Sequence, residues 1–419
     1  MRHDQDRHVG VHLLHSGLGI LSSVLGTVVI FILIARGLGP ADFGRFALSY
    51  AVASLAGIVF DFGYLPRLLR DTEAIVARWG GLPARALHLK AILLAVGTPL
   101  LLGAGGIAGL DLRILAATWA GIALISIANL FAAMLRARNR HGRDAVNQFA
   151  ANALGACMAL GAYALSAPAF WFALVFPAIG SLYLALTLRP WRQSFALMPE
   201  PIALASITAE ARAGLAYLLD TLTQRGFNFL DVTIFSAVAS PMLVGLYQAG
   251  QKIAIGAGLA AQPFNNVMLP RLSRLSDNPK QWRKAARRFF VQQAGVGVAA
   301  FVLMAALGPF MVGLLYTPAY APVRGYMWLF GALAGARYVA SALGIMVTAL
   351  GHQRHRTKVN ILALATFAAA APLLSARFDI AGLISASIIS ILFIIMGNLT
   401  VVAYKRPGPR LWHVSAPDA

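Results

Sequence analysis

Apolar runs of about 20 residues recur from one end of this 419-residue chain to the other. A run of that length is what an α-helix needs to cross the hydrocarbon core of a membrane. The sequence is 59% hydrophobic and 12% charged, with a mean hydropathy of +0.71, whereas soluble domains carry about 25% charged residues. The short alternating segments of a transmembrane β-barrel are absent. The sequence therefore predicts an all-α polytopic membrane protein.

The apolar runs predict twelve transmembrane helices. Their expected bounds are 16–35, 46–66, 91–110, 114–134, 147–166, 169–188, 214–236, 242–264, 290–312, 326–350, 359–375 and 380–403. A proline-rich stretch near residue 195 separates the first six runs from the last six. We therefore expect two six-helix bundles around a central cavity. The predicted parts are an N-terminal bundle at 1–190, a cytoplasmic linker at 191–213, a C-terminal bundle at 214–404 and a cytoplasmic tail at 405–419.

Positive charge alternates between the connections on the two sides of the predicted membrane. Of the 35 Lys and Arg residues, 27 fall on one side together with both termini, 5 fall on the other side, and 3 lie inside predicted spans. Lys90 is among the 27, in the connection before the third span. The positive-inside rule places the rich side in the cytoplasm. The net charge of +20 is thus explained by topology and not by nucleic-acid binding.

Three cationic residues lie near the middle of separate spans: Arg225, Lys252 and Arg337. A lone charge at the bilayer centre costs roughly 2.5–3.5 kcal/mol on insertion scales, so such residues usually face a pore, a partner or a ligand. If all three face one cavity, they form a positively charged pocket inside the membrane. That pocket would attract an anionic cargo.

Amide side chains accompany these cations on the same helical faces. They are Gln224 and Asn228 in the seventh span, and Gln248 and Gln251 in the eighth. Arginine presents a planar fork of donors to phosphate oxygens, and amides suit sugar hydroxyls because they both donate and accept. The set predicts a binding site for a sugar that carries a diphosphate.

Carboxylates inside or near the spans allow two interpretations. Asp220 or Asp231 can pair with Arg225, in which case that cation needs no ligand. Alternatively, Asp61, Asp220 or Asp231 can serve as proton-coupling carboxylates, as in many pumps. Both interpretations remain open at this point.

Other motifs give little evidence of chemistry. The chain has no G-x-x-x-x-G-K-[ST], H-E-x-x-H or G-x-S-x-G sequence, so we expect neither an ATP-driven motor nor a hydrolase. His8, His12 and His15 have helical spacing near the polar start of the chain, where we expect an interfacial segment rather than a metal site, and we expect no cofactor. The basic stretch around Trp282 is either an amphipathic segment on the membrane surface or simple topology-setting charge.

Two short segments suggest related halves. Pro40 to Phe46 and Pro241 to Tyr247 both read Pro-x-x-x-Gly-x-aromatic, and each occupies the first outer turn of its half. With six spans in each half, both halves enter the membrane in the same orientation, which predicts a parallel repeat about an axis along the membrane normal.

The segment from Phe31 to Asp71 resembles the opening of Wzx-type polysaccharide transporters, which belong to the multidrug/oligosaccharidyl-lipid/polysaccharide exporter (MOP) superfamily. The matching residues are Ala35-Arg36-Gly37-Leu38-Gly39-Pro40, Phe43-Gly44-x-Phe46 and Asp61-Phe62-Gly63. Gly245-Leu246-Tyr247, Lys252-Ile253 and Pro270-Arg271-Leu272-Ser273 look like the corresponding elements of the second half.

The resemblance implies a flippase of the bacterial inner membrane that works by alternating access. The implied cargo is an undecaprenyl-diphosphate-linked oligosaccharide for O-antigen or exopolysaccharide export. The implied partners are this lipid-linked oligosaccharide, membrane lipids and the polysaccharide polymerase machinery. Two alternatives stay open: a cation-coupled multidrug antiporter of the same superfamily, and a membrane polysaccharide polymerase or ligase. The latter would carry a sizeable outer loop, which the sequence does not show.

Overall fold

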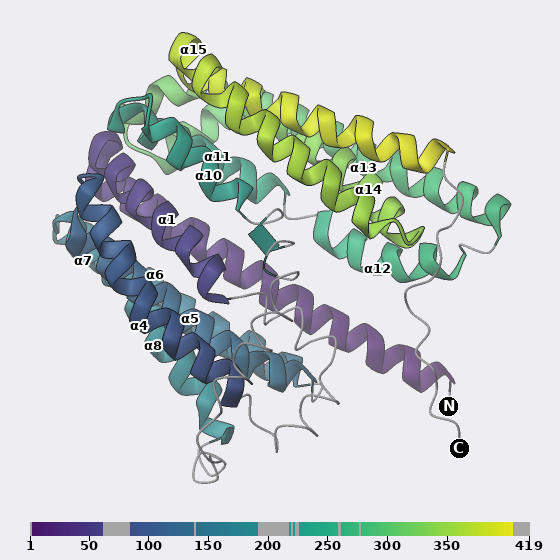
Figure 1. The fold of residues 1–419 in the computed structure, drawn as a ribbon, viewed down its shortest axis with the longest axis horizontal. Coiled ribbons are helices and arrows are strands. Elements are labelled where there is room, and N and C mark those ends of the chain that lie inside the picture. Colours follow the sequence, from purple (N-terminus) through teal and green to yellow (C-terminus); the bar gives the residue numbers. More distant parts are fainter. Residues whose placement is uncertain are drawn as a thin grey trace. The chain divides into compact units, whose positions relative to one another are not determined.

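A computed structural model describes residues 2–61, 84–137, 140–191, 218, 221–222, 226–258, 261–275 and 278–404. Every regular element in these residues is a helix (Figure 1), as the sequence predicts. The α-helices are α1 (Arg2–Asp61), α4 (Ala84–Ile107), α5 (Leu112–Ala137), α6 (His141–Ala164), α7 (Ala169–Ala173), α8 (Val175–Leu188), α10 (Phe227–Ser236), α11 (Pro241–Gly258), α12 (Ala261–Arg274), α13 (Pro279–Leu315), α14 (Met327–Ala349) and α15 (Gln353–Tyr404). The 3₁₀ segments η1 (Arg189–Trp191) and η3 (Pro318–Tyr326) complete this set.

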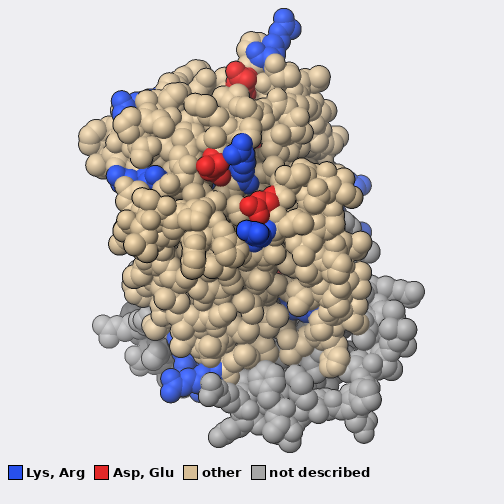
Figure 2. Space-filling model, turned by 90° about the vertical axis from the view of Figure 1, so that its left-hand side faces the viewer, with Lys and Arg blue, Asp and Glu red and all other residues tan. Residues whose placement is uncertain are grey.

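Seven helical segments in the described part of the chain are long and apolar enough to cross a membrane. They are Leu25–Asp61, Leu87–Ile107, Leu112–Arg136, Ala169–Leu188, Pro279–Leu315, Pro318–Ala349 and Gln353–Tyr404. Charged side chains are few on the face drawn in Figure 2, where most of the visible surface belongs to uncharged residues. The chain is a multi-pass membrane protein. The count of twelve spans and the two-bundle layout remain predictions.

Two of the long helices each contain two of the expected spans. The backbone leaves the helical conformation at Gly39 in α1 (φ 72°, ψ 172°) and at Asp379 in α15 (φ 49°, ψ −128°). In α15 the two arms lie side by side: the Ser390 hydroxyl donates to the carbonyl of Ala363 at 2.7 Å. A positive φ suits glycine at the first position, so the sequence itself marks the end of the first expected span.

The described residues divide into two compact units. The first unit comprises Met1–Ala249 with Tyr316–Ala319, and the second comprises Gly250–Leu315 with Tyr320–Ala419. In the first unit α1 packs against α5, α6 and α10, and α5 packs against α8. In the second unit α14 packs against α12, α13 and α15. The expected boundary at residues 191–213 lies mostly outside the described residues and stays a prediction.

Small residues allow the closest helix contacts, as is usual where helices pack in a membrane. In the second unit, a Cβ atom on Gly297 of α13 would lie 2.9 Å from the carbonyl oxygen of Gly335 in α14, and the reverse distance is 3.0 Å. Any larger side chain at either position would push α13 away from α14.

The two Pro-x-x-x-Gly turns meet within the first unit. A Cβ atom on Gly44 would overlap the carbonyl of Pro241, and a Cβ on Gly245 would overlap the carbonyl of Pro40. The Cβ atom on Gly44 would also lie 2.9 Å from the amide nitrogen of Gly245, and the Cβ atom on Gly245 would lie 3.1 Å from the amide nitrogen of Gly44. The contact is therefore reciprocal, and each glycine is needed because backbone from the other turn occupies the place of its side chain.

Candidate functional site

A buried ion pair joins α1, α4 and α5 in the first unit. Lys90 is 2% exposed, and its Nζ lies 3.1 Å from Oδ1 of Asp61. Ser126 of α5 links the two groups, since its hydroxyl accepts from Lys90 and donates to Asp61. The ammonium also lies 4.7 Å from the centre of the Phe60 ring. The attraction and hydrogen bonds offset the cost of removing both charges from water.

The position of Lys90 corrects the sequence analysis, which placed this residue in a cytoplasmic connection. The structure puts it in α4, within the span Leu87–Ile107. Sequence reasoning missed it because Lys90 stands at the end of an apolar run, where a charge normally reaches the membrane surface. Asp61, expected as a coupling carboxylate, has its charge paired with Lys90, and its role in coupling stays a prediction.

A second buried carboxylate in this unit is held by a tyrosine. Asp231 of α10 is 1% exposed. Its Oδ2 accepts a hydrogen bond from the hydroxyl of Tyr247 in α11 at 2.7 Å, and its Oδ1 accepts one from the amide of Val232 at 2.7 Å. The hydrogen bond from Tyr247 ties α10 to α11.

A third carboxylate cluster was not expected from the sequence. Asp144 of α6 is 4% exposed and lies 3.1 Å from Nε of Arg136 in α5. The Tyr183 hydroxyl donates to Asp144 at 2.8 Å, and the Gln148 amide donates to it at 3.0 Å. Asp144 is the only acidic residue in the basic turn between two spans, and that contrast was the available clue.

In the second unit, Arg337 lies half-buried near the middle of α14. It makes no ion pair or hydrogen bond within the part of the chain that the structure describes. This differs from Lys90 and Arg136, which both have a carboxylate partner. A half-buried guanidinium inside an apolar helix is costly unless it meets an anion, so Arg337 is the described residue best placed to bind one.

A chain of neutral polar groups begins one helical turn from Arg337. Ser341 of α14 accepts a hydrogen bond from Asn265 of α12 at 2.7 Å, and Asn265 accepts one from Gln293 of α13 at 3.2 Å. Gln293 is 1% exposed, and its Oε1 has no hydrogen-bond partner among the described residues. The sequence analysis missed Asn265 and Gln293, because the residues meet only when three helices pack together.

The part of α11 that belongs to the second unit, from Gly250 on, lies beside α14. Tyr338 donates a hydrogen bond to the carbonyl of Ala257 at 2.7 Å, and the Phe330 ring packs over Gly250. These two contacts mean that the helices run in the same direction. They place Arg337 roughly 7 Å further along the helix axes than Lys252, at 1.5 Å per residue.

The other α11 residues differ in burial. Lys252 is half-buried, whereas Gln248 and Gln251 are 4% and 1% exposed. Lys252 and Gln251 both take part in interactions of their own. No direct contact between Lys252 and Arg337 is found in the structure, so their joint action on one ligand is a prediction that the helix pairing permits.

Part of the predicted site lies outside the described residues. This applies to Arg225, Gln224 and Asp220, and also to the side chain of Asn228 in α10. The expected meeting of Arg225 with Lys252 and Arg337 therefore stays a prediction. Within the described residues, no group of three or more His, Cys, Asp or Glu side chains is arranged to hold a metal ion.

Long apolar helices with buried ion pairs between them are features of a polytopic membrane protein. A family model described as "Polysaccharide biosynthesis protein" matches residues 12–276. The chain belongs to that family, and the predicted resemblance to polysaccharide transporters of the MOP superfamily is confirmed. A search of curated protein sequences finds no match.

Solved structures with the same fold are also transporters. One is "Lipid II flippase MurJ, inward closed conformation", with 11% identity, a TM-score of 0.75, and coverage of 94% of this chain and 88% of that one. Another is an inward-facing multidrug resistance MATE family transporter of the MOP superfamily. It has 14% identity, a TM-score of 0.69, and coverage of 91% of this chain and 95% of that one. A third is a MOP superfamily transporter from Pyrococcus furiosus that is described as having a binding pocket of reverse polarity. It has 15% identity, a TM-score of 0.61, and coverage of 93% of each chain. These relatives are transporters and flippases rather than enzymes, in agreement with the expectation for this chain.

Proposed function

We propose that this protein is a flippase that moves undecaprenyl-diphosphate-linked oligosaccharides across the bacterial inner membrane by alternating access. The polysaccharide family and the fold shared with a lipid II flippase support this class of cargo. The exported repeat unit would serve O-antigen or exopolysaccharide synthesis. In this proposal both termini lie in the cytoplasm, because the cation-rich connections lie on the same side as the termini.

The observation that carries the proposal is the environment of Arg337. Arg337 belongs to the apolar helix α14, and no described carboxylate neutralises its guanidinium. Arginine binds two phosphate oxygens at once through its planar fork of donors. Lys252, roughly 7 Å away along the helix axes, would add a second charge to the same diphosphate, and Arg225 would add a third.

Neutral polar groups near this cation would contact the sugar. The amide chain of Asn265 and Gln293 presents both donors and acceptors, as sugar hydroxyls require. Gln293 retains an unused acceptor in the described part of the molecule. Gln248, Gln251, Gln224 and Asn228 extend the same kind of lining in the proposal. The prenyl chain would stay in lipid while the headgroup crosses.

The meeting of the two Pro-x-x-x-Gly turns supports alternating access. Gly44 and Gly245 lie at connections on the cation-poor side, which the proposal assigns to the outer face of the membrane. Their backbones approach so closely that no cargo can pass between them. Separation of these two turns would open an outward path, and their contact corresponds to an outward-closed state.

The first alternative is a cation-coupled multidrug antiporter, because several structures of the same fold are MATE transporters. A cation-binding cavity needs carboxylates with charge to spare. Asp61 and Asp144 are each paired with a basic residue, and Asp231 accepts a hydrogen bond from Tyr247. This favours an anionic cargo, while coupling through Asp61, Asp220 or Asp231 remains part of the proposal.

A reconstituted transport assay tests the function. The full chain would be placed in liposomes with a fluorescent undecaprenyl-diphosphate oligosaccharide, and a membrane-impermeant quencher would report its leaflet. We expect faster exchange than in protein-free liposomes, and no efflux of an organic cation such as ethidium under an imposed proton gradient. Ethidium efflux without exchange of the lipid-linked sugar would assign the antiporter function instead.

A further inference from the structure

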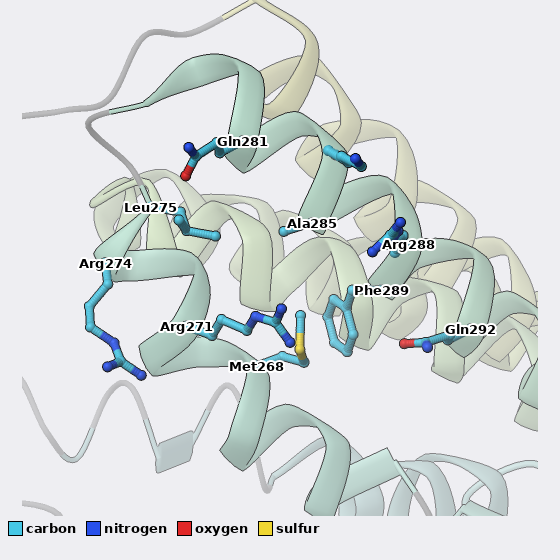
Figure 3. Close-up of a pocket in the computed structure, with 10 residues that line it drawn as sticks. Met268, Arg271, Arg274, Leu275, Gln281, Ala285, Arg288, Phe289 and Gln292 are labelled. Carbon is cyan, nitrogen blue, oxygen red and sulfur yellow. The ribbon is translucent and has the colours of Figure 1, made fainter. Parts of the chain in front are cut away.

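A cavity lies on the outer face of the helical hairpin formed by the end of α12 and the start of α13, in the second unit. Its volume is about 620 Å³. Four basic side chains and two glutamines contribute to its lining (Figure 3): Arg271, Arg274, Lys284, Arg288, Gln281 and Gln292. A second hollow of about 830 Å³ adjoins it and shares Lys284, Arg288 and Gln292 with it.

The buried side of the hairpin fixes the orientation of this basic face. Trp282, Ala286 and Phe289 recur at helical spacing along α13 and are 7%, 4% and 0% exposed. They pack with Leu272 of α12 and Met346 of α14 in one apolar cluster. The intervening cations are exposed, so the stretch is amphipathic, and its location on the membrane surface stays a prediction.

The described lining of the cavity is strongly basic. Among the described residues that line the two hollows there is no carboxylate. None of the four lining cations makes an ion pair within the residues that the structure describes. In Figure 3, Arg271 reaches across the cavity toward Phe289 and Met268. Like charges that line one cavity repel one another, so an anion that enters the cavity relieves the repulsion.

The surface beside the cavity is apolar along α13, which suits the chain of a lipid. Val291, Val298 and Val302 continue along α13 from Lys284, and they are 60%, 62% and 53% exposed. Lys284, Val291 and Val298 are seven residues apart, so they lie along one face of the helix. An acyl or prenyl chain against the valines would place its headgroup at Lys284 and Arg288. A soluble anion would gain nothing from this apolar stripe.

We propose that the cavity between α12 and α13 binds the phosphate headgroup of an anionic membrane lipid. The arginines bind the phosphate oxygens, the lysine adds charge at the membrane surface, and the glutamines contact headgroup hydroxyls. A glycerophospholipid and a prenyl diphosphate both carry this chemistry. The site is separate from Arg337 and does not depend on the proposed transport activity.

The test uses the purified full chain and native mass spectrometry of bound lipid. The pocket variant combines Arg271→Gln, Lys284→Gln and Arg288→Gln. The matched control removes two arginines and one lysine from exposed positions elsewhere: Arg113→Gln, Arg354→Gln and Lys358→Gln. Each variant is titrated with phosphatidylglycerol, phosphatidylcholine, undecaprenyl diphosphate and inorganic pyrophosphate. Circular dichroism and size-exclusion chromatography confirm that both variants are folded.

We expect the pocket variant to bind phosphatidylglycerol or undecaprenyl diphosphate at least tenfold more weakly than the wild type, since each basic residue near the surface contributes about a factor of five. The control should retain wild-type affinity, and whichever lipid shows the difference is the occupant. An Arg271→Lys, Arg288→Lys variant should retain part of the affinity. Equal losses in the pocket variant and the control would overturn the proposal. So would binding of pyrophosphate as tight as that of either lipid.

Discussion

Lys90 and Asp61 form an ion pair of 3.1 Å that ties α4 to the end of α1, with the Ser126 hydroxyl hydrogen-bonded to both charged groups. Lys90 is almost wholly buried, whereas the Asp61 side chain keeps 23% of its surface exposed. The aspartate is thus the partner that an ion or a solvent molecule can reach. The pair stabilises the first unit and also places one accessible carboxylate next to a fixed positive charge.

Replacement of Lys90 by methionine should destabilise the protein, because it leaves Asp61 without its counter-charge in an apolar setting. Loss of one partner of a buried pair costs about 3–5 kcal/mol. We expect a clear fall in the thermal unfolding midpoint in detergent. The double variant Lys90→Met, Asp61→Asn should recover much of the loss. An unchanged midpoint for Lys90→Met would show that the pair contributes nothing to stability.

Substitution of Gly44 by alanine should separate the two Pro-x-x-x-Gly turns, because the new Cβ overlaps the carbonyl of Pro241. In a Cys157→Ser, Ser240→Cys background, this variant should label faster with an impermeant maleimide. The matched control is Gly103→Ala, an exposed helical glycine with no atom within 4 Å of its added Cβ. Identical labelling rates in the two variants would contradict the close contact of the turns.

Two substitutions in the amide chain should have unequal effects on stability. Asn265→Ala removes the partner of both Ser341 and the buried Gln293, and an unsatisfied buried polar group costs about 1–3 kcal/mol. Gln293→Leu removes the group that would be left unsatisfied, so it should be less destabilising. Thermal unfolding of both variants checks this order. A larger loss for Gln293→Leu would mean that Asn265 is not the centre of the network.

Removal of the Tyr183 hydroxyl should weaken the Asp144 cluster without abolishing it. Tyr183→Phe deletes one charge-assisted hydrogen bond, while Arg136 and Gln148 still contact the carboxylate. The expected cost is about 1.5–3 kcal/mol. Arg136→Met should cost more than Tyr183→Phe because it removes the counter-charge. Equal midpoints for Arg136→Met and the wild type would show that the ion pair is not needed for stability.

Apolar helices could be predicted from the sequence because the hydropathy of each run depends only on the residues of that run. The sequence also singled out Arg337 as a candidate, since one cation in an apolar run is visible without a partner, and the role of this residue stays a prediction. The turn at Gly39 belongs to the same kind of local information. The expected span begins at residue 290, whereas α13 itself begins at Pro279. The exposed arginines of its first turns lower the local hydropathy, so the hydropathy pattern alone does not show that the helix starts before the span.

Partners in space could not be read from single runs. Lys90 is hydrogen-bonded to Asp61 and Ser126, which lie on two other helices at sequence separations of 29 and 36 residues. Asn265 is hydrogen-bonded to Gln293 and Ser341, which follow it in the sequence by 28 and 76 residues. Nothing in the local sequence distinguishes these residues from polar groups at the membrane surface. Their burial follows from tertiary packing, which sets the partner and the depth together.

The central claim is that Arg337 binds the phosphate groups of the cargo. The direct measurement is the leaflet-exchange rate of fluorescent undecaprenyl-diphosphate oligosaccharide in liposomes that contain equal amounts of Arg337→Ala, Arg337→Lys or Arg113→Ala protein. We predict that Arg337→Ala exchanges the lipid no faster than empty liposomes, that Arg337→Lys retains part of the rate, and that the exposed-site control Arg113→Ala matches the wild type. Wild-type exchange by Arg337→Ala would contradict the proposed role of this residue.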